Sequence, residues 1–152
     1  MPVSAGDTFL YPLNESTKEH LWVVATDPHD DGRVAIVSLT SLRGAKDQTV
    51  ILRKGDHPFI KWETCVYYAF ADVWSTEKIA AEVAASNPVH LESLRPDILQ
   101  LIVDGFTSSD FVKNRVLIYV SERKRNRKAS ANPPGTSSAD DLEGSAQTGS
   151  RR

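Results

Sequence analysis

The chain has 152 residues, of which 40% are hydrophobic and 25% are charged, and this composition is typical of a globular domain with its own core. No apolar run approaches the roughly 20 residues that a transmembrane helix needs, and the N-terminus lacks the basic and apolar segments of a secretory signal, so we expect a cytoplasmic protein. Cys65 is the single cysteine, which excludes an internal disulfide and a cysteine-rich zinc site.

The net charge of −2 is unevenly distributed along the chain. Residues 122–152 hold seven Lys/Arg and four Asp/Glu, whereas residues 1–121 hold 11 Lys/Arg and 16 Asp/Glu. The acidic balance of the first part argues against strong general affinity for nucleic acid, which depends on neutralising phosphates. The window Arg43–Lys61 is a local exception, with five basic and two acidic residues. This window lies within residues 34–73, the stretch on which we expect a functional site to be built.

Five short runs rich in β-branched and aromatic residues occupy the first half of the chain, and turn residues such as Asp31-Gly32 separate them. Their number and their spacing of about 10 residues predict a small barrel or sandwich. The second run is apolar almost throughout, so we expect Trp22 to lie in the core. The predicted strands are Gly6–Pro12, Leu21–Thr26, Val34–Leu39, Thr49–Leu52 and Glu63–Ala69, the last reaching Trp74.

Helical patterns follow the strands, which makes the predicted class α+β and mainly β. Thr76–Val83 is a short predicted helix that Ser75 or Thr76 caps. A clearer helix begins near Pro96, and Gly105 is its predicted stop. Phe111–Val120 fits a helical stripe, although a strand is the alternative because its second half is rich in β-forming residues.

The pattern of apolar residues ends at Arg123. Arg123–Lys128 is a basic run, which either binds nucleic acid or keeps the following segment solvated. Ala129–Arg152 consists largely of Ser, Gly, Pro, Ala and Thr, and such a segment buries too little apolar surface to offset its conformational entropy. We therefore predict a folded domain over residues 1–121 and a basic, then disordered, tail over residues 122–152.

Four segments of the first half carry a further pattern. Gly6-Asp7 opens the first strand, Glu19–Thr26 is an apolar run, Val37–Ser41 reads Val-Ser-Leu-Thr-Ser, and Glu63–Val73 closes the series. In this order they resemble the PemK/MazF family of toxin–antitoxin systems, in which the third segment typically reads (V/A)-P-(I/C)-T-(S/T). The resemblance implies an SH3-like barrel of five to six strands with C-terminal helices. It also implies an endoribonuclease that cleaves single-stranded RNA without a metal or cofactor, forms a homodimer and binds an antitoxin protein.

The resemblance places two residues in a catalytic site. Thr40 matches the family's catalytic threonine, and His20 falls where the family has an arginine. Histidine can act as a general acid or base near neutral pH, but it lacks the bidentate fork with which arginine holds phosphate. The structural alternatives are a surface histidine at a loop end and a threonine that hydrogen-bonds within its own turn.

The segment Lys54–Trp62 is a tight turn that the resemblance does not explain. Asp56 and Pro58 flank His57, and a neighbouring carboxylate can orient an imidazole, so His57 is a third candidate catalytic residue. The alternative is a turn in which His57 has a purely structural role. The candidate RNA-binding residues are Arg43, Lys46, Arg53, Lys54, Lys61 and Trp62, the last as an exposed stacking platform.

Two functions therefore remain open from the sequence. The first is the endoribonuclease, and the second is a non-catalytic SH3-like module that binds a protein or peptide through the His57 turn and Trp62. The missing arginine and the acidic remainder of the domain favour the second. The position of Lys54–Trp62 relative to His20 discriminates between them, since a shared face indicates a catalytic site and opposite faces favour the binding module.

Overall fold

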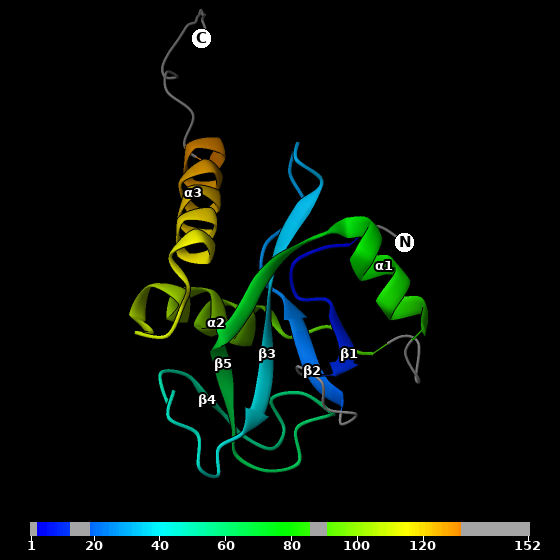
Figure 1. The fold of residues 1–152 in the computed structure, drawn as a ribbon, viewed down its shortest axis with the longest axis vertical. Coiled ribbons are helices and arrows are strands. Elements are labelled where there is room, and N and C mark those ends of the chain that lie inside the picture. Colours follow the sequence, from blue (N-terminus) through cyan, green and yellow to red (C-terminus); the bar gives the residue numbers. More distant parts are fainter. Residues whose placement is uncertain (1–2, 13–18, 86–90, 132–152) are drawn as a thin grey trace, which may run out of the picture. The chain divides into compact units, whose positions relative to one another are not determined.

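A computed structural model describes residues 3–12, 19–85 and 91–131 of the chain. The chain divides into two compact units, residues 1–120 and 121–152, and each is described by itself. The first unit is an α+β fold in which an antiparallel five-stranded sheet is followed in sequence by two helices and the start of a third, which continues into the second unit (Figure 1). The predicted disordered segment lies outside the described residues from residue 132 onwards.

The sheet contains all five predicted strands, with shifted ends. They are β1 (Thr8–Pro12), β2 (Glu19–Val24), β3 (Arg33–Ser41), β4 (Ile51–Leu52) and β5 (Thr64–Ser75). Neighbouring strands are antiparallel, and the order across the sheet is β1-β2-β3-β5-β4. The last two strands thus exchange places relative to the chain order. The connection between β3 and β4 starts beside the first residue of β5, because Ser41 pairs with Thr64.

An irregularity between β3 and β5 curves the sheet into a half-barrel. Ile36 pairs with Asp72, but Ser38 pairs with Tyr67, so residues 68–71 of β5 stand opposite the single residue Val37. Extra residues on one strand bend it and increase the local twist. Strand β5 accordingly follows a long curved path from the β4 end of the sheet to the first helix (Figure 1).

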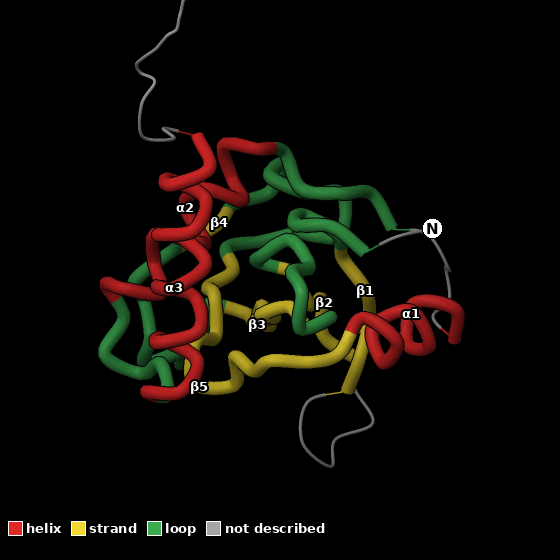
Figure 2. The backbone as a smooth tube through the Cα atoms, turned by 90° about the horizontal axis from the view of Figure 1, so that it is seen from above, coloured by secondary structure: helices red, strands yellow, loops and turns green. Residues whose placement is uncertain are grey.

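Side chains alternate between two buried faces of the sheet. On one face, Val23, Val37 and Val66 pack against the second and third helices. On the other face, Trp22 and Ile36 pack against the first helix, and Trp22 is buried as predicted. Figure 2 shows the first and second helices on opposite sides of the strands.

The first helix, α1 (Thr76–Ala85), begins at the residue predicted from the sequence. The Lys78 backbone N–H donates to Ser75 Oγ over 3.2 Å, so Ser75 supplies the predicted cap. Ile79 is fully buried and joins α1 to the core cluster that contains Trp22.

The third helix, α3 (Asn114–Ala131), corrects two expectations. Within the predicted segment Phe111–Val120, the residues from Asn114 onwards are helical. The helix prediction is confirmed for these residues, and the strand alternative is wrong. The expectation that regular structure ends near Arg123 is also wrong, because the helix continues through the basic run. Lys, Arg and Ala are good helix formers, so a run of basic residues is compatible with a helix once an apolar turn has started it. No helix in the described part of the chain is long and apolar enough to cross a membrane.

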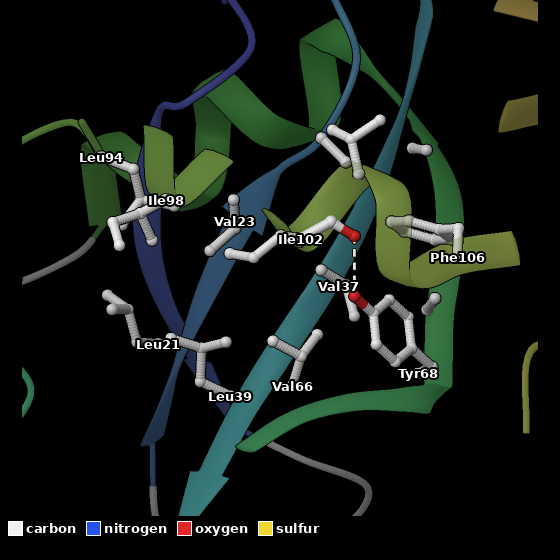
Figure 3. Close-up of a cluster of buried hydrophobic side chains, with 14 of the residues drawn as sticks. Leu21, Val23, Val37, Leu39, Val66, Tyr68, Leu94, Ile98, Ile102 and Phe106 are labelled. Carbon is white, nitrogen blue, oxygen red and sulfur yellow. Dashed lines mark hydrogen bonds between the residues drawn. The ribbon is translucent and has the colours of Figure 1, made fainter. Parts of the chain in front are cut away.

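The second helix, α2 (Pro96–Ser108), lies very close to the sheet. The sequence predicted that the helix ends at Gly105. This prediction is wrong, because the helix continues for three more residues. Tyr68 on β5 donates a hydrogen bond from its hydroxyl to Ile102 O over 2.6 Å (Figure 3). A Cβ atom at Gly105 would lie 1.9 Å from the same hydroxyl oxygen, so the glycine permits this close approach of helix and strand.

An ion pair joins β5 to the first turn of α3. Arg115 Nη1 lies 2.8 Å from Asp72 Oδ1. Burial raises the pKa of Asp72, but the hydrogen bond from the Val73 backbone and the pairing with Arg115 outweigh it, so the pKa lies below its usual range. A carboxylate with a lowered pKa in the folded state stabilises the fold above its unfolded pKa of about 4, and this contribution is lost as the pH falls.

We therefore expect Asp72→Asn to lower the melting temperature most at pH 7, with a difference from wild type that shrinks below about pH 4. Thermal unfolding followed by circular dichroism at several pH values measures this difference. Asp110→Asn is the matched control, because Asp110 is exposed and has no ion pair among the described residues. A difference for Asp72→Asn that does not change with pH would contradict the assigned ion pair.

Candidate functional site

His20 and Thr40 lie side by side on adjacent strands. Trp22 on β2 pairs with Ser38 on β3, so in this antiparallel register His20, two residues before Trp22, stands opposite Thr40. Thr40 in turn pairs with Cys65 on β5, which is buried. The structure thus brings two of the three candidate catalytic residues together at one end of the sheet.

A hydrogen bond fixes the imidazole of His20. His20 Nδ1 lies 3.1 Å from Leu39 O. A carbonyl oxygen only accepts hydrogen bonds, so Nδ1 carries the proton in the neutral ring and Nε2 holds a free electron pair. The ring is half-buried, and within the described residues no partner occupies Nε2. His20 is therefore oriented as a proton acceptor, which is the arrangement a general base needs.

A pocket of about 120 Å³ surrounds these two residues, and we call it the His20 pocket. It is closed on one side by the segment that follows His57, which contributes two exposed aromatic side chains, Phe59 (43% exposed) and Trp62 (63% exposed). Trp62 is therefore exposed, as the sequence predicted. The pocket is lined by residues 19–21, 39–41, 59–62 and Thr64.

Two further pockets adjoin the first. The Asp47 pocket, of about 400 Å³, shares Thr40 and Ser41 with the His20 pocket and extends toward Arg43, Lys46, Asp47, Tyr67 and Phe111. The His57 pocket, of about 380 Å³, shares Ile60 and Lys61 with the His20 pocket and extends toward Lys54, His57, Glu92 and Arg95. The shared residues place the three pockets in a series, with the His20 pocket in the middle.

His57 lies in the outer pocket, apart from His20 and Thr40. It is 3% exposed, and both ring nitrogens contact the backbone. Nδ1 accepts a hydrogen bond from Phe59 N over 3.0 Å, and Nε2 lies 2.5 Å from Glu92 O, to which it donates. In this arrangement His57 ties the segment that carries Trp62 to the chain just before α2, which corresponds to the structural alternative for this turn.

We expect His57→Ala to lower the free energy of unfolding, because it empties a buried position and removes the hydrogen bonds of the ring to Phe59 N and Glu92 O, each worth about 0.5–1.5 kcal/mol. Glu92 O keeps the hydrogen bond that it accepts from Thr8 Oγ1. Urea denaturation measures the change. Lys54→Ala is the control, since Lys54 lines the same pocket but is exposed. If His57→Ala instead leaves stability unchanged and abolishes an activity of the protein, His57 has a chemical role and the structural one is wrong.

Five of the six candidate RNA-binding residues divide among the pockets, and Arg53 lines none of them. Lys61 and Trp62 line the His20 pocket, Arg43 and Lys46 line the Asp47 pocket, and Lys54 lines the His57 pocket. Arg53 lies 3.7 Å from Glu63 and forms an exposed ion pair with it. The basic window of the sequence is therefore distributed along the whole series of hollows rather than gathered at one point.

The Asp47 pocket also contains residues that the sequence analysis did not select as site residues, namely Asp47, Tyr67 and Phe111. Asp47 is buried, and its Oδ2 accepts a hydrogen bond from Ser109 Oγ over 2.9 Å. This bond joins the connection after β3 to the connection after α2. The local signal was the Asp-Gln-Thr sequence at residues 47–49, an arrangement in which Asp accepts hydrogen bonds from the residue two positions on.

No protein-family model, no curated protein and no solved structure matches this chain. The resemblance to the PemK/MazF family accordingly stays a prediction.

Proposed function

We propose that the protein is a metal-independent endoribonuclease of the toxin–antitoxin kind, built on an SH3-like barrel, that cleaves single-stranded RNA in the His20 pocket. The observation that carries this proposal is the orientation of the His20 imidazole. Its Nδ1 proton is held by Leu39 O, its Nε2 is open, and the hydroxyl-bearing Thr40 stands beside it. Lys61 lines the same pocket and supplies a positive charge.

The reaction that these groups support is attack of a ribose 2′-oxygen on the adjacent phosphorus. His20 Nε2 takes the proton of the 2′-hydroxyl as the new oxygen–phosphorus bond forms. The bond from phosphorus to the 5′-oxygen of the next nucleotide breaks, and that oxygen takes a proton from water. Lys61 and the Thr40 hydroxyl stabilise the negative charge that grows on the phosphate oxygens. The products are a 2′,3′-cyclic phosphate and a 5′-hydroxyl.

The surroundings of His20 suit an extended single strand. Unstacked bases bind to aromatic side chains, and Trp62 and Phe59 offer exposed rings at the rim of the pocket. Arg43 and Lys46 on one side and Lys54 on the other line the adjoining pockets and can pair with phosphates. As a toxin, the protein would be inhibited by an antitoxin that covers these pockets, and the resemblance implies that it acts as a homodimer.

The test is incubation of the purified protein with a long unstructured RNA in EDTA, followed by mapping of the fragment ends. We expect discrete fragments with 2′,3′-cyclic phosphate ends, and growth arrest when the protein is produced in cells. Intact RNA under these conditions, without growth arrest, would reject the ribonuclease.

One observation favours a second candidate, the non-catalytic binding module. Phe59 and Trp62 form an exposed apolar rim, and such patches mark surfaces that bind other molecules. In that case Trp62→Ala weakens binding of a peptide partner, while His20→Ala leaves the binding unchanged. Trp62 contributes to binding in both candidates, so the two are separated by cleavage of RNA in EDTA, which the binding module does not perform and which His20→Ala abolishes in the ribonuclease.

A further inference from the structure

Asp47 is a buried carboxylate that can accept one hydrogen bond more than the three it accepts in the structure. It is 4% exposed and lines the pocket that adjoins the His20 pocket. Oδ1 accepts hydrogen bonds from Thr49 Oγ1 over 2.7 Å and from Thr49 N over 3.2 Å, and Oδ2 accepts one from Ser109 Oγ over 2.9 Å. A carboxylate offers about four acceptor positions, so one position on Oδ2 remains open.

The charge of Asp47 has no cationic partner in the part of the chain that the structure describes. Arg43 and Lys46 line the same pocket without forming an ion pair with it. Three hydrogen bonds offset part of the cost of burying this carboxylate, and a further donor would offset more of it. The open position on Oδ2 therefore fits a hydrogen-bond donor on a bound molecule.

The walls of the Asp47 pocket are suited to a flat ring. Tyr67 is held edge-to-face against Phe70, with ring centroids 4.6 Å apart, and Phe111 presents a ring that is 43% exposed. The volume of about 400 Å³ lies within the range of ordinary ligand pockets. Aromatic walls, a carboxylate and basic residues together are the features with which proteins hold an unstacked nucleobase.

The position of the pocket fixes which base would occupy it. The Asp47 and His20 pockets share Thr40 and Ser41, so a base in one belongs to a nucleotide next to the phosphate in the other. A carboxylate accepts hydrogen bonds from an exocyclic amino group, such as that of cytosine, and repels the carbonyl that uracil carries at the same place.

We propose that the Asp47 pocket binds the nucleobase beside the cleaved phosphate and selects bases with an exocyclic amino group over uracil. Asp47 accepts the amino hydrogen, Phe111 stacks on the ring, and Arg43 and Lys46 contact the flanking phosphates. This inference rests on the proposed RNA function and adds a base preference to it.

The experiment measures binding, so it does not depend on cleavage. Five-nucleotide 2′-O-methyl oligomers of cytidine and of uridine, labelled with a fluorophore, are titrated with the protein and followed by anisotropy. We expect the wild type to bind the cytidine oligomer about tenfold more tightly, which is the discrimination of one good base contact. Asp47→Asn removes most of this preference, because an amide can also donate to the uracil carbonyl.

Two further variants serve as a control for Asp47→Asn and as a separate test of base stacking. Ser109→Ala removes a hydrogen bond to Asp47 but leaves its carboxylate in place, so the preference for cytidine persists. Phe111→Ala, at an exposed position, weakens binding of the cytidine oligomer by about tenfold through lost stacking. Unchanged affinity of Phe111→Ala would overturn the placement of the base in this pocket, even if Asp47→Asn fails to fold.

The outcomes separate this inference from the proposed function. Equal affinity of the wild type for both oligomers would overturn the base preference and leave the RNA site standing. Failure of the wild type to bind either oligomer would overturn both.

Discussion

Replacing His20 by alanine is expected to lower the rate of RNA cleavage by about 10²- to 10⁴-fold, which is the usual contribution of a general base. Leu39 O holds the Nδ1 side of the imidazole, and His20 lines the pocket. The variant removes the proton acceptor but keeps the aromatic rim and Lys61, so RNA binding is retained. Cleavage of a defined RNA, measured at saturating protein, gives the rate of the chemical step.

His29→Ala is the matched control for this experiment. His29 is exposed in the connection between β2 and β3, lines none of the three pockets, and is expected to be dispensable. The melting temperature of His20→Ala should stay close to that of the wild type, because the ring is only half-buried. A cleavage rate of His20→Ala within about threefold of the wild type would remove His20 from the mechanism.

Replacing Gly105 by alanine is expected to have the largest effect on stability. Alanine is a better helix former than glycine by about 1 kcal/mol, so helix propensity alone predicts stabilisation. The added Cβ would however lie 1.9 Å from Tyr68 Oη, 2.7 Å from Tyr68 Cζ and 2.7 Å from a methyl carbon of Val50. Overpacking of a core typically costs about 1–3 kcal/mol, so we expect a net loss of free energy of unfolding.

The Tyr68→Phe background tests the stated cause of this loss. Removing the hydroxyl eliminates the closest of the three contacts, so Gly105→Ala should cost less in Tyr68→Phe than in the wild type. Urea denaturation of the two single variants and the double variant gives this coupling. Gly105→Ala with stability equal to or above the wild type would show that α2 does not lie as close to β5 as described.

The strands were predictable because their signals are local. Alternating or continuous runs of β-branched and aromatic residues, bounded by turn residues, located all five strands, and the same patterns placed Trp22 in the core. The helix α1 was also predictable, since Ser75 provides a local cap. These features depend on residues within a few positions of one another.

The errors concern residues whose roles depend on distant parts of the chain. Gly105 resembles a helix stop, but its role is to admit Tyr68, which is 37 positions earlier in the sequence. Arg123 resembles the end of regular structure, yet the helix continues past it. In both cases the local sequence pattern is typical of a helix end, but the helix continues in the folded protein.

The candidate site also contains residues that local sequence identified and contacts that depend on distant parts of the chain. His20, Thr40, Lys61 and Trp62 were selected from the sequence, and they line one pocket. His57 was selected for its turn residues, but its Nε2 donates to Glu92 O, 35 positions away, which no local pattern reveals. The pairing of Asp47 with Ser109 spans 62 positions and was equally hidden.

Binding of single-stranded RNA at the His20 pocket can be observed by nuclear magnetic resonance with an uncleavable 2′-O-methyl RNA. The indole signal of Trp62 and the imidazole signals of His20 should shift on binding. The indole signal of Trp22 should stay in place, because that ring is buried and its Nε1–H donates to Tyr11 O. Absence of shifts at Trp62 and His20, or shifts confined to another surface, would contradict the account.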